Sequence, residues 1–183
     1  VYQKSRILYG LFQSKGGIRR EDRVLLVEGY TDTMRLHQCG FDFCVASSGT
    51  ALTEEQAKLI LRYTRNVILV YDGDSAGFNA ALRGIDILVN AGHHVHVSPL
   101  PAGSDPDSLF RDRGAGIMKT ILSEMRSFLD YSLERLSDQG RLKNAHGRAE
   151  AARSILKTIG QIRDPIERNL LVKELAEKLG LDE

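Results

Sequence analysis

Four short runs of strand-forming residues, each separated from the next by one amphipathic stretch, are the feature that most limits how this chain can fold. The runs occupy residues 24–27, 43–46, 67–70 and 94–98. Strands that are apolar on both faces and joined by single helices are typical of a parallel sheet that helices cover on both sides. The sequence therefore predicts a small α/β domain with parallel strands.

The stretches between these runs carry the signals of helices. Residues 31–39 are amphipathic, and the spacing of Thr53 and Gln56 is that of a capping box at the start of a helix. Apolar residues recur at helical spacing over residues 78–89 and stop at Gly92, which is a typical helix end. These helices are expected to cover the sheet.

The strand pattern disappears after Pro101, and only helical patterns follow. We predict one amphipathic helix over residues 117–136 and another over residues 149–162. A third helix is predicted after Asp164 and Pro165, which form a cap and a first-turn proline. The side chains expected to face inward on this third helix are Ile166, Leu170, Leu171, Leu175 and Leu179.

These patterns divide the chain into a lead-in segment (residues 1–21), an α/β domain (22–115) and an all-helical subdomain (116–183). The lead-in is strongly basic. Residues 1–20 contain five Lys or Arg and no carboxylate, so with a net charge of +1 for the whole chain the other 163 residues stand at −4. A basic segment beside a carboxylate-rich one is expected of a site that handles phosphates.

Composition excludes several classes of protein. Hydrophobic residues make up 42% of the chain and charged residues 27%, which is typical of a globular domain and not of a collagen-like or disordered one. No apolar run approaches the roughly 18 to 20 residues of a membrane span, and the first residues lack the layout of a signal peptide. We therefore expect a cytoplasmic protein without a membrane partner. The chain starts with Val1, which suggests a piece of a longer protein.

The cysteines and histidines show no pattern of metal ligands. Cys39 and Cys44 have no second pair to complete a zinc site, so we expect buried free thiols and no zinc. His93, His94 and His96 have no cysteine or carboxylate at ligand spacing. We interpret them as ordinary strand positions.

Acidic or hydroxyl-bearing residues follow each predicted strand. Glu28 follows the first strand, residues 47–50 the second, Asp72 and Asp74 the third, and residues 104–107 lie after the fourth. The carboxyl ends of parallel strands meet at one edge of a sheet, where ligands bind. We therefore expect these side chains to lie on one rim of the domain.

Asp72 and Asp74 are two residues apart in extended chain, so both side chains can point the same way. Carboxylates this close repel each other unless a cation lies between them, and Mg²⁺ is bound by a few carboxylates together with water and phosphate oxygens. An isolated Asp-x-Asp also occurs in turns and helix caps. Combined with Glu28, the pair predicts a divalent metal site.

Four motifs resemble the Toprim core of bacterial DnaG-type replicative primases. They are VEGYTD at 27–32, ASSGTALT at 46–53, VYDGDSAG at 70–77 and DPDSL at 105–109. The stretch KSRILYG at 4–10 is similar to the one that precedes this core in the same family. The resemblance extends over the whole chain. It implies a Toprim-type parallel sheet flanked by helices and followed by an all-helical subdomain.

The resemblance implies that Glu28, Asp72 and Asp74 form an acidic triad that holds catalytic Mg²⁺ or Mn²⁺. The implied reaction is attack by a ribonucleotide 3′-hydroxyl on the α-phosphate of a ribonucleoside triphosphate, with release of pyrophosphate. Single-stranded DNA is the template, and the product is a short RNA primer for DNA replication. The metals would stabilise charge on the entering and leaving oxygens.

Further residues take implied roles around this triad. Asp105 and Asp107 would extend the acidic cluster as metal ligands, and Asp32 would assist nearby. The lead-in would belong to the catalytic core, with Lys4 and Arg6 in contact with phosphates of the nucleotide or the growing primer.

The same resemblance sets expectations about context. Primases of this type also have an amino-terminal zinc-binding module, a first catalytic subdomain and a carboxy-terminal helicase-binding domain, and we recognise none of these in the chain. We therefore expect contact with the replicative helicase through a domain absent here. The fragment should hold the metal site but lack much of the template groove, and the protein should work in the bacterial cytoplasm, at the nucleoid or replisome.

Other functions stay open. Toprim domains also occur in nucleases and topoisomerases, although no residue here indicates the nucleophilic tyrosine of a topoisomerase. Phosphatases of the haloacid dehalogenase type place two aspartates after their first strand, whereas here the pair follows the third. From a different class, the chain could be a non-catalytic nucleic-acid-binding module. Tyr2, Tyr9 and Phe12 lie among the basic residues and suit either stacking on bases or anchoring of the lead-in.

Overall fold

The computed structural model describes residues 3–47, 49, 51–114 and 116–181. Val1 and Tyr2, and Ser48 and Thr50 of the motif at 46–53, lie outside this described part. The chain forms two compact units, Val1–Met125 and Arg126–Glu183. The first carries the acidic motifs, and the second is helical.

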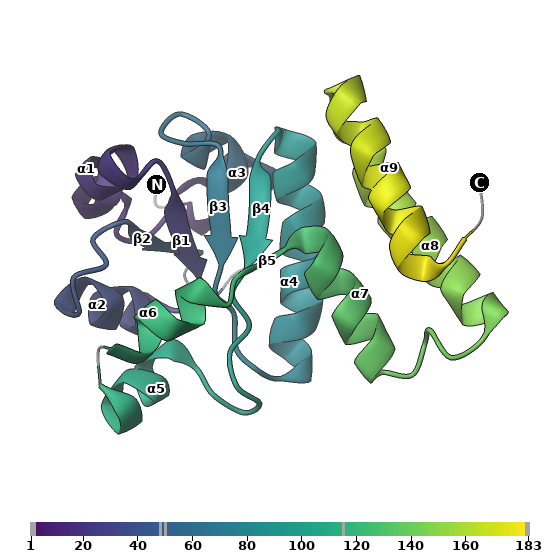
Figure 1. Cartoon of the computed structure of the whole chain (residues 1–183). Coiled ribbons are helices and arrows are strands. Elements are labelled where there is room, and N and C mark those ends of the chain that lie inside the picture. Colours follow the sequence, from purple (N-terminus) through teal and green to yellow (C-terminus); the bar gives the residue numbers. More distant parts are fainter. Residues whose placement is uncertain (1–2, 48, 50, 115, 182–183) are drawn as a thin grey trace. The chain divides into compact units, whose positions relative to one another are not determined.

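The first unit is built on a parallel sheet (Figure 1). Its strands are β1 (Val24–Val27), β2 (Cys44–Ala46), β3 (Asn66–Leu69) and β4 (His94–Val97), in the order β2-β1-β3-β4. Every residue of β1 and β2 is buried, as expected of strands covered on both faces. The predicted parallel α/β architecture is confirmed. Because β1 pairs with β3, the carboxyl ends of these two strands are neighbours.

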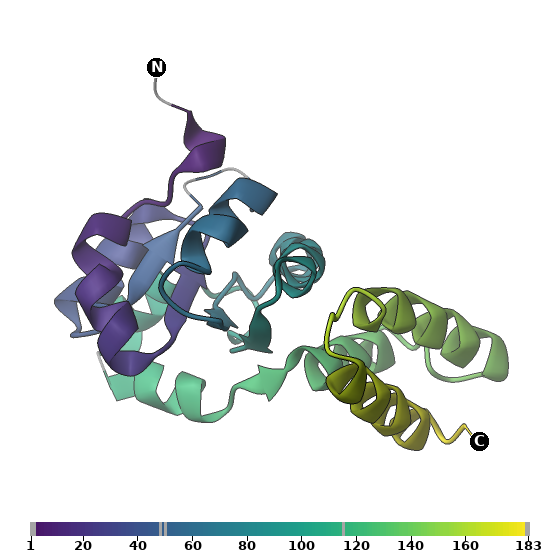
Figure 2. The same ribbon diagram turned by 90° about the horizontal axis from the view of Figure 1, so that it is seen from above.

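Helices cover both faces of this sheet. They are the 3-10 helix η1 (Lys4–Arg6), α1 (Leu11–Glu21), α2 (Tyr30–Gln38), α3 (Glu54–Ile60), α4 (Ser75–Ala91), α5 (Pro106–Arg113) and α6 (Gly116–Ser123). Helix α3 packs against α4 on one face, and α2 packs against α5 on the other (Figure 2). The predicted capping box at Thr53 and Gln56 is present.

The lead-in segment is an integral part of this unit. Tyr9 and Ala46 form an antiparallel bridge with N–H···O distances of 2.9 and 3.1 Å. Helix α1 follows, packs against β2 and buries Ser14 and Ile18. The sequence did not predict α1, because residues 11–21 combine two glycines and four charged residues and show no regular apolar stripe.

The boundary between the units lies after Met125, whereas the sequence placed it after residue 115. Helix α6 accounts for the difference. It packs against α5, buries Met118 and Ile121, and accepts a hydrogen bond of 2.7 Å from the Ser98 hydroxyl to the Ile121 carbonyl. These contacts fix α6 to the α/β unit, which local periodicity could not show.

The second unit contains the two-residue strand β5 (Arg126–Ser127) and helices α7 (Phe128–Asp138), α8 (Ala145–Ile159) and α9 (Pro165–Leu179). The single helix predicted over residues 117–136 is wrong, because the chain breaks between α6 and α7 and Ser127 caps α7 by accepting a hydrogen bond of 3.1 Å from the Asp130 N–H.

The inward face predicted for α9 is also only partly correct. Leu175 and Leu179 are buried, but Ile166 is 71% exposed and Leu170 is 62% exposed. Helix α9 thus buries only its carboxyl-terminal half within its own unit. There the Lys178 ammonium lies 2.8 Å from the Asp130 carboxylate and joins α9 to α7.

Both cysteines are free thiols, with Cys44 buried and Cys39 half-buried. His93 is a buried structural residue whose ring nitrogens lie 2.9 Å from the Ala57 carbonyl oxygen and 3.2 Å from that of Arg65. Within the described ranges, no helix has both the length and the apolar character needed to cross a membrane.

Candidate metal centre

Glu28 follows directly after β1 and is half-buried at the carboxyl edge of the sheet. Its Oε1 atom is buried and has no hydrogen-bond partner among the residues that the structure describes. Burial raises the pKa of this carboxyl, and Asp72, Asp74 and Asp32 raise it further, while the backbone N–H of Asp72 has the opposite effect. The carboxylates that follow β1 and β3 are therefore electrostatic neighbours, as the topology predicts.

Asp72 is held in place by the loop that follows it. The Gly73 N–H donates a hydrogen bond of 2.9 Å to the Ser104 carbonyl, and the Gly73 carbonyl accepts one of 3.1 Å from the Gly103 N–H. A Cβ atom at Gly73 would collide with the backbone oxygen of Pro101, so only glycine permits this approach. The loop after β4 is thus fastened to the loop after β3.

This close approach places Asp105 beside Asp72. Burial raises the pKa of Asp72, and the charges of Asp105 and Asp74 raise it further. Asp105 also caps α5, where its Oδ1 accepts a hydrogen bond of 2.8 Å from the Ser108 N–H. Three carboxylates from two loops therefore share one electrostatic environment.

Asp74 is exposed and forms the amino-terminal cap of α4, with its Oδ1 atom 2.7 Å from the Gly77 N–H. A Cβ atom at Gly77 would collide with the Asp72 carbonyl oxygen, so a glycine is required there as well. The turn after β3 is consequently tight. It carries both aspartates of the Asp-x-Asp motif, and its backbone conformation requires glycine at positions 73 and 77.

Asp32 lies in the first turn of α2 and is buried. Its Oδ2 atom accepts a hydrogen bond of 3.2 Å from the Gly29 N–H, and its Oδ1 atom accepts one of 3.3 Å from the Asp107 N–H. Burial and the charges of Asp72 and Asp105 raise the pKa of Asp32 to about 6. Asp32 therefore links α2 to α5, and its carboxylate also interacts electrostatically with Asp72 and Asp105.

Asp107 is engaged differently from the other acids. Its carboxylate lies 2.9 Å from the Arg35 Nε atom and 4.0 Å from an Arg111 guanidinium nitrogen. Sequence reasoning missed Arg35, which stands one helical turn after Asp32 on α2. Its partner lies 72 residues away, so only the packing of α2 against α5 reveals the pair.

The chemistry of these donors suits a hard divalent cation. The side chains offer oxygen ligands, one Glu28 oxygen is buried and unpartnered, and the neighbouring acids raise one another's pKa, an effect that a bound cation would reverse. As they stand, however, no three or more histidine, cysteine or carboxylate side chains of the described residues converge closely enough to hold a metal ion. The acids are adjacent but do not form a closed ligand set.

Lys4 and Arg6 lie on η1, where both are exposed. The backbone of η1 is anchored to the start of α3, because the Gln56 amide donates a hydrogen bond of 3.1 Å to the Lys4 carbonyl and the Thr53 hydroxyl donates one of 2.6 Å to the Ser5 carbonyl. The causes of the raised pKa values among the acids do not include Lys4 or Arg6. The structure does not bring these cations into contact with the carboxylates.

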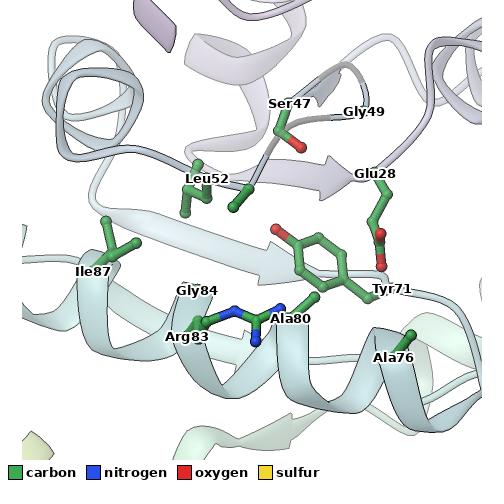
Figure 3. Close-up of a pocket in the computed structure, with 11 residues that line it drawn as sticks. Glu28, Ser47, Gly49, Leu52, Tyr71, Ala76, Ala80, Arg83, Gly84 and Ile87 are labelled. Carbon is green, nitrogen blue, oxygen red and sulfur yellow. The ribbon is translucent and has the colours of Figure 1, made fainter.

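A cavity of about 310 Å³ opens beside Glu28, between the ends of the strands and α4 (Figure 3). Tyr71 and Arg83 line it, and both were missed in the sequence. Tyr71 is buried; burial and Glu28 raise its pKa, whereas Arg83 opposes the shift. Ser47, from the second sequence motif, also faces this cavity.

Comparisons with known proteins agree with this architecture. A family model described as Toprim-like matches residues 25–110, and one described as the DnaB-helicase binding domain of primase matches residues 129–183. The DNA primase of Clostridium acetobutylicum is 38% identical over 184 residues, which cover 100% of this chain and 30% of that protein. The chain thus spans less than a third of this relative's length.

Solved structures match the whole chain. A DNA primase domain from Pseudomonas aeruginosa gives a TM-score of 0.86 at 31% identity, with 100% of this chain and 58% of that one covered. A DnaG primase catalytic domain bound to single-stranded DNA gives a TM-score of 0.85 at 34% identity, with 100% and 59% covered.

One expectation about partners requires correction. We expected the helicase-binding domain to be absent, but the family model with that description matches residues 129–183 of this chain. The apolar stripes of these helices indicate a packed core and carry no signal for a partner, so the sequence pattern alone could not show this. Together the matches to both units show that the chain belongs to the bacterial DnaG-type primases and corresponds to the Toprim-containing part of their catalytic core.

Proposed function

We propose that this chain supplies the metal-binding part of the catalytic core of a primase that synthesises short RNA primers on single-stranded DNA. The observation that carries the proposal is the position of Glu28 at the edge where Asp72 and Asp74 also follow a strand. One oxygen of its carboxylate is buried there and has no hydrogen-bond partner among the described residues. Family membership supports the reaction class, because the matched relatives are DNA primases.

In this proposal Glu28, Asp72 and Asp74 bind Mg²⁺ or Mn²⁺, and Asp105 completes the acidic edge. The bound metal supplies charge stabilisation at the reacting phosphate. Asp74 is oriented by its cap on α4, and Asp72 by the hydrogen bonds of Gly73. These fixed positions reduce the reorganisation needed when substrate binds.

Asp32 and Asp107 have a positioning role as well as a place in the acidic cluster. Asp32 accepts hydrogen bonds from the backbones of α2 and α5, and Asp107 pairs with Arg35. We therefore rank both below the other acids as metal ligands. They keep the loop that carries Asp105 against the end of the sheet.

The proposed substrates are ribonucleoside triphosphates and the growing RNA primer. The primer's 3′-hydroxyl attacks the α-phosphate, the bond from that phosphorus to the bridging oxygen breaks, and pyrophosphate leaves. Lys4 and Arg6 are exposed cations on a segment anchored to α3, and they attract the phosphates of nucleotide or primer.

Two macromolecular partners complete the proposal. Single-stranded DNA is the template, as supported by the matched catalytic domain that is bound to such a strand. The replicative helicase binds through residues 129–183, as supported by the family model for that segment. A non-catalytic nucleic-acid module would leave the unpartnered Glu28 oxygen and the clustered acids unexplained.

The decisive experiment is Glu28→Gln in the full-length primase, with primer synthesis measured on a single-stranded template. We expect synthesis to be lost while the melting temperature and DNA affinity stay unchanged, because the substitution removes only one charge at the edge. Glu177→Gln, an exposed position on α9, is the control and should keep full activity. Normal primer yields from folded Glu28→Gln enzyme would overturn the proposal.

A further inference from the structure

The outer surface of α1 presents an aromatic ring and two cations on one face. Phe12, Lys15 and Arg19 stand at positions i, i+3 and i+7, which places them along one side of the helix. All three are exposed, and the Phe12 side chain is 76% exposed. Figure 2 shows α1 on the outside of the first unit.

The cations on this face are paired with rings rather than with acids. The Lys15 Nζ atom lies 4.2 Å from the centroid of the Phe12 ring, and the Arg19 guanidinium carbon lies 5.4 Å from that of Tyr63. Tyr63, which follows α3, thereby joins the same surface. Cations held over aromatic faces are pre-ordered and remain available to anions.

Packing within the unit does not account for Phe12. The inward side of α1 is formed by Ser14, Gly17 and Ile18, which are buried, whereas Phe12 points away from them. A phenylalanine that exposes three-quarters of its surface contributes little to a core. Its position suits contact with a molecule outside the unit.

The cations on this face have no carboxylate partner among the described residues. Arg20, on another side of α1, forms an ion pair of 2.6 Å with Asp42. For Lys4, Arg6, Lys15 and Arg19, by contrast, no ion pair exists within the part of the chain that the structure describes. The lead-in therefore presents unneutralised positive charge next to an exposed ring, which favours a polyanion with flat apolar groups.

We propose that the outer face of α1, consisting of Phe12, Lys15, Arg19 and Tyr63, binds single-stranded nucleic acid. A base stacks on Phe12, while Lys15 and Arg19 contact phosphates. Phe12 and Arg19 are about 10 Å apart along the helix axis, so the ring and the guanidinium can contact different nucleotides of one strand. The inference rests on the proposed function, since it assumes a nucleic-acid substrate, but it concerns a surface that contains none of the carboxylates.

The test is fluorescence anisotropy of a labelled oligothymidylate with the intact chain. Phe12→Ala should weaken binding about tenfold, and Phe12→Tyr, which keeps a ring, should restore most of the affinity. Lys15→Ala and Arg19→Ala should each reduce the salt dependence of binding by about 0.7 in the log–log slope. Arg20→Ala removes the same charge from the same helix and should leave affinity within about twofold.

Several results would overturn this inference. One is an equal loss of affinity in Phe12→Ala and Arg20→Ala, which would show that the Phe12 ring has no specific role in binding. Another is unchanged affinity in Phe12→Ala, and a third is Phe12-dependent binding to anionic lipid vesicles without binding to the oligonucleotide. Phe12→Leu, which retains apolar bulk without a ring, should behave like Phe12→Ala, and melting curves verify the fold of every variant.

The proposed function and the α1 surface are tested by different measurements, so either proposal can be rejected without the other. Glu28→Gln should abolish primer synthesis by the full-length enzyme while oligothymidylate affinity stays the same. Phe12→Ala should lower affinity, with primer synthesis recovering at high template concentration. Loss of synthesis in Glu28→Gln together with normal binding by Phe12→Ala would reject the α1 surface and leave the catalytic proposal intact.

Discussion

Asp32 on α2 accepts a hydrogen bond of 3.3 Å from the backbone N–H of Asp107 on α5, so a buried carboxylate joins two helices on one face of the sheet. The same carboxylate lies in the field of Asp72 and Asp105, which together with burial raises its pKa to about 6. A structural contact and the electrostatics of the acidic edge therefore depend on one side chain.

This arrangement predicts a specific dependence of stability on pH. The ordinary pKa of an aspartate is 3.8, so between about pH 4 and pH 6 folded Asp32 retains a proton that the unfolded chain has released. Stability must then fall as pH rises through this window, by about 2 kcal/mol in the absence of metal. Urea unfolding of the isolated chain at a series of pH values measures this contribution.

Asp32→Asn should remove the contribution of Asp32, so the free energy of unfolding should depend less on pH between about pH 4 and pH 6. Asp112→Asn, at an exposed position on α5, should leave the wild-type slope unchanged. A slope across this window that is the same in Asp32→Asn and in the wild type would show that Asp32 is not the titrating group.

Gly73 gives a second prediction, because its backbone fastens the loop after β4 to the loop after β3. Gly73→Ala places a methyl group against the Pro101 carbonyl and should destabilise the chain by about 1–3 kcal/mol in urea unfolding. Gly16→Ala is the matched control, since a Cβ there meets nothing within 4 Å. Gly16 lies in the interior of α1, so Gly16→Ala should raise the free energy of unfolding by about 0.5–1 kcal/mol. Equal effects of the two substitutions would show that the collision is relieved at little cost.

Much of this architecture is encoded locally. The strands at 24–27 and 67–70 are predictable because each is a continuous apolar run between helices, and parallel pairing then forces Glu28 and Asp72 to the same edge. The predicted cap at Thr53 is equally local, since it depends on two residues three positions apart. The cap at Asp105 has the same spacing but was not predicted.

The parts that were missed depend on contacts between distant segments. In the sequence Arg35 is an ordinary helical cation, and only the packing of α5 shows its pairing with Asp107. Tyr71 follows the predicted strand without a distinguishing pattern, and only the fold brings Arg83 of α4 near it. Helix α1 lacks an apolar stripe and is defined by its packing on β2. Ile166 matches the spacing of an inward face but lies where no neighbouring helix of its unit covers it.

Metal binding gives a third prediction. Calorimetric titration of the isolated chain with Mn²⁺ should show weak binding that Glu28→Gln or Asp72→Asn reduces at least about tenfold, because each removes a charged oxygen donor. Binding should strengthen as pH rises above the range in which ordinary carboxyls titrate, since carboxyls whose pKa is raised must lose their protons first. Asp112→Asn is again the control. Undiminished Mn²⁺ affinity in Glu28→Gln would remove that residue from the site.

The exposed half of α9 gives the last prediction. Ile166 and Leu170 stand one turn apart and are mostly exposed, so the double variant Ile166→Glu/Leu170→Glu should change the free energy of unfolding by less than about 1 kcal/mol. Leu175→Ala, on the buried half, should lower the free energy of unfolding by about 2–5 kcal/mol.

The same double variant also tests helicase binding. If the helicase docks on residues 129–183 through Ile166 and Leu170, the double variant in full-length primase should weaken association with the helicase at least about tenfold. Lys157→Glu, an exposed position on α8, controls for added negative charge. Sedimentation velocity with the purified helicase measures the association, and unchanged affinity in the double variant would place the contact elsewhere.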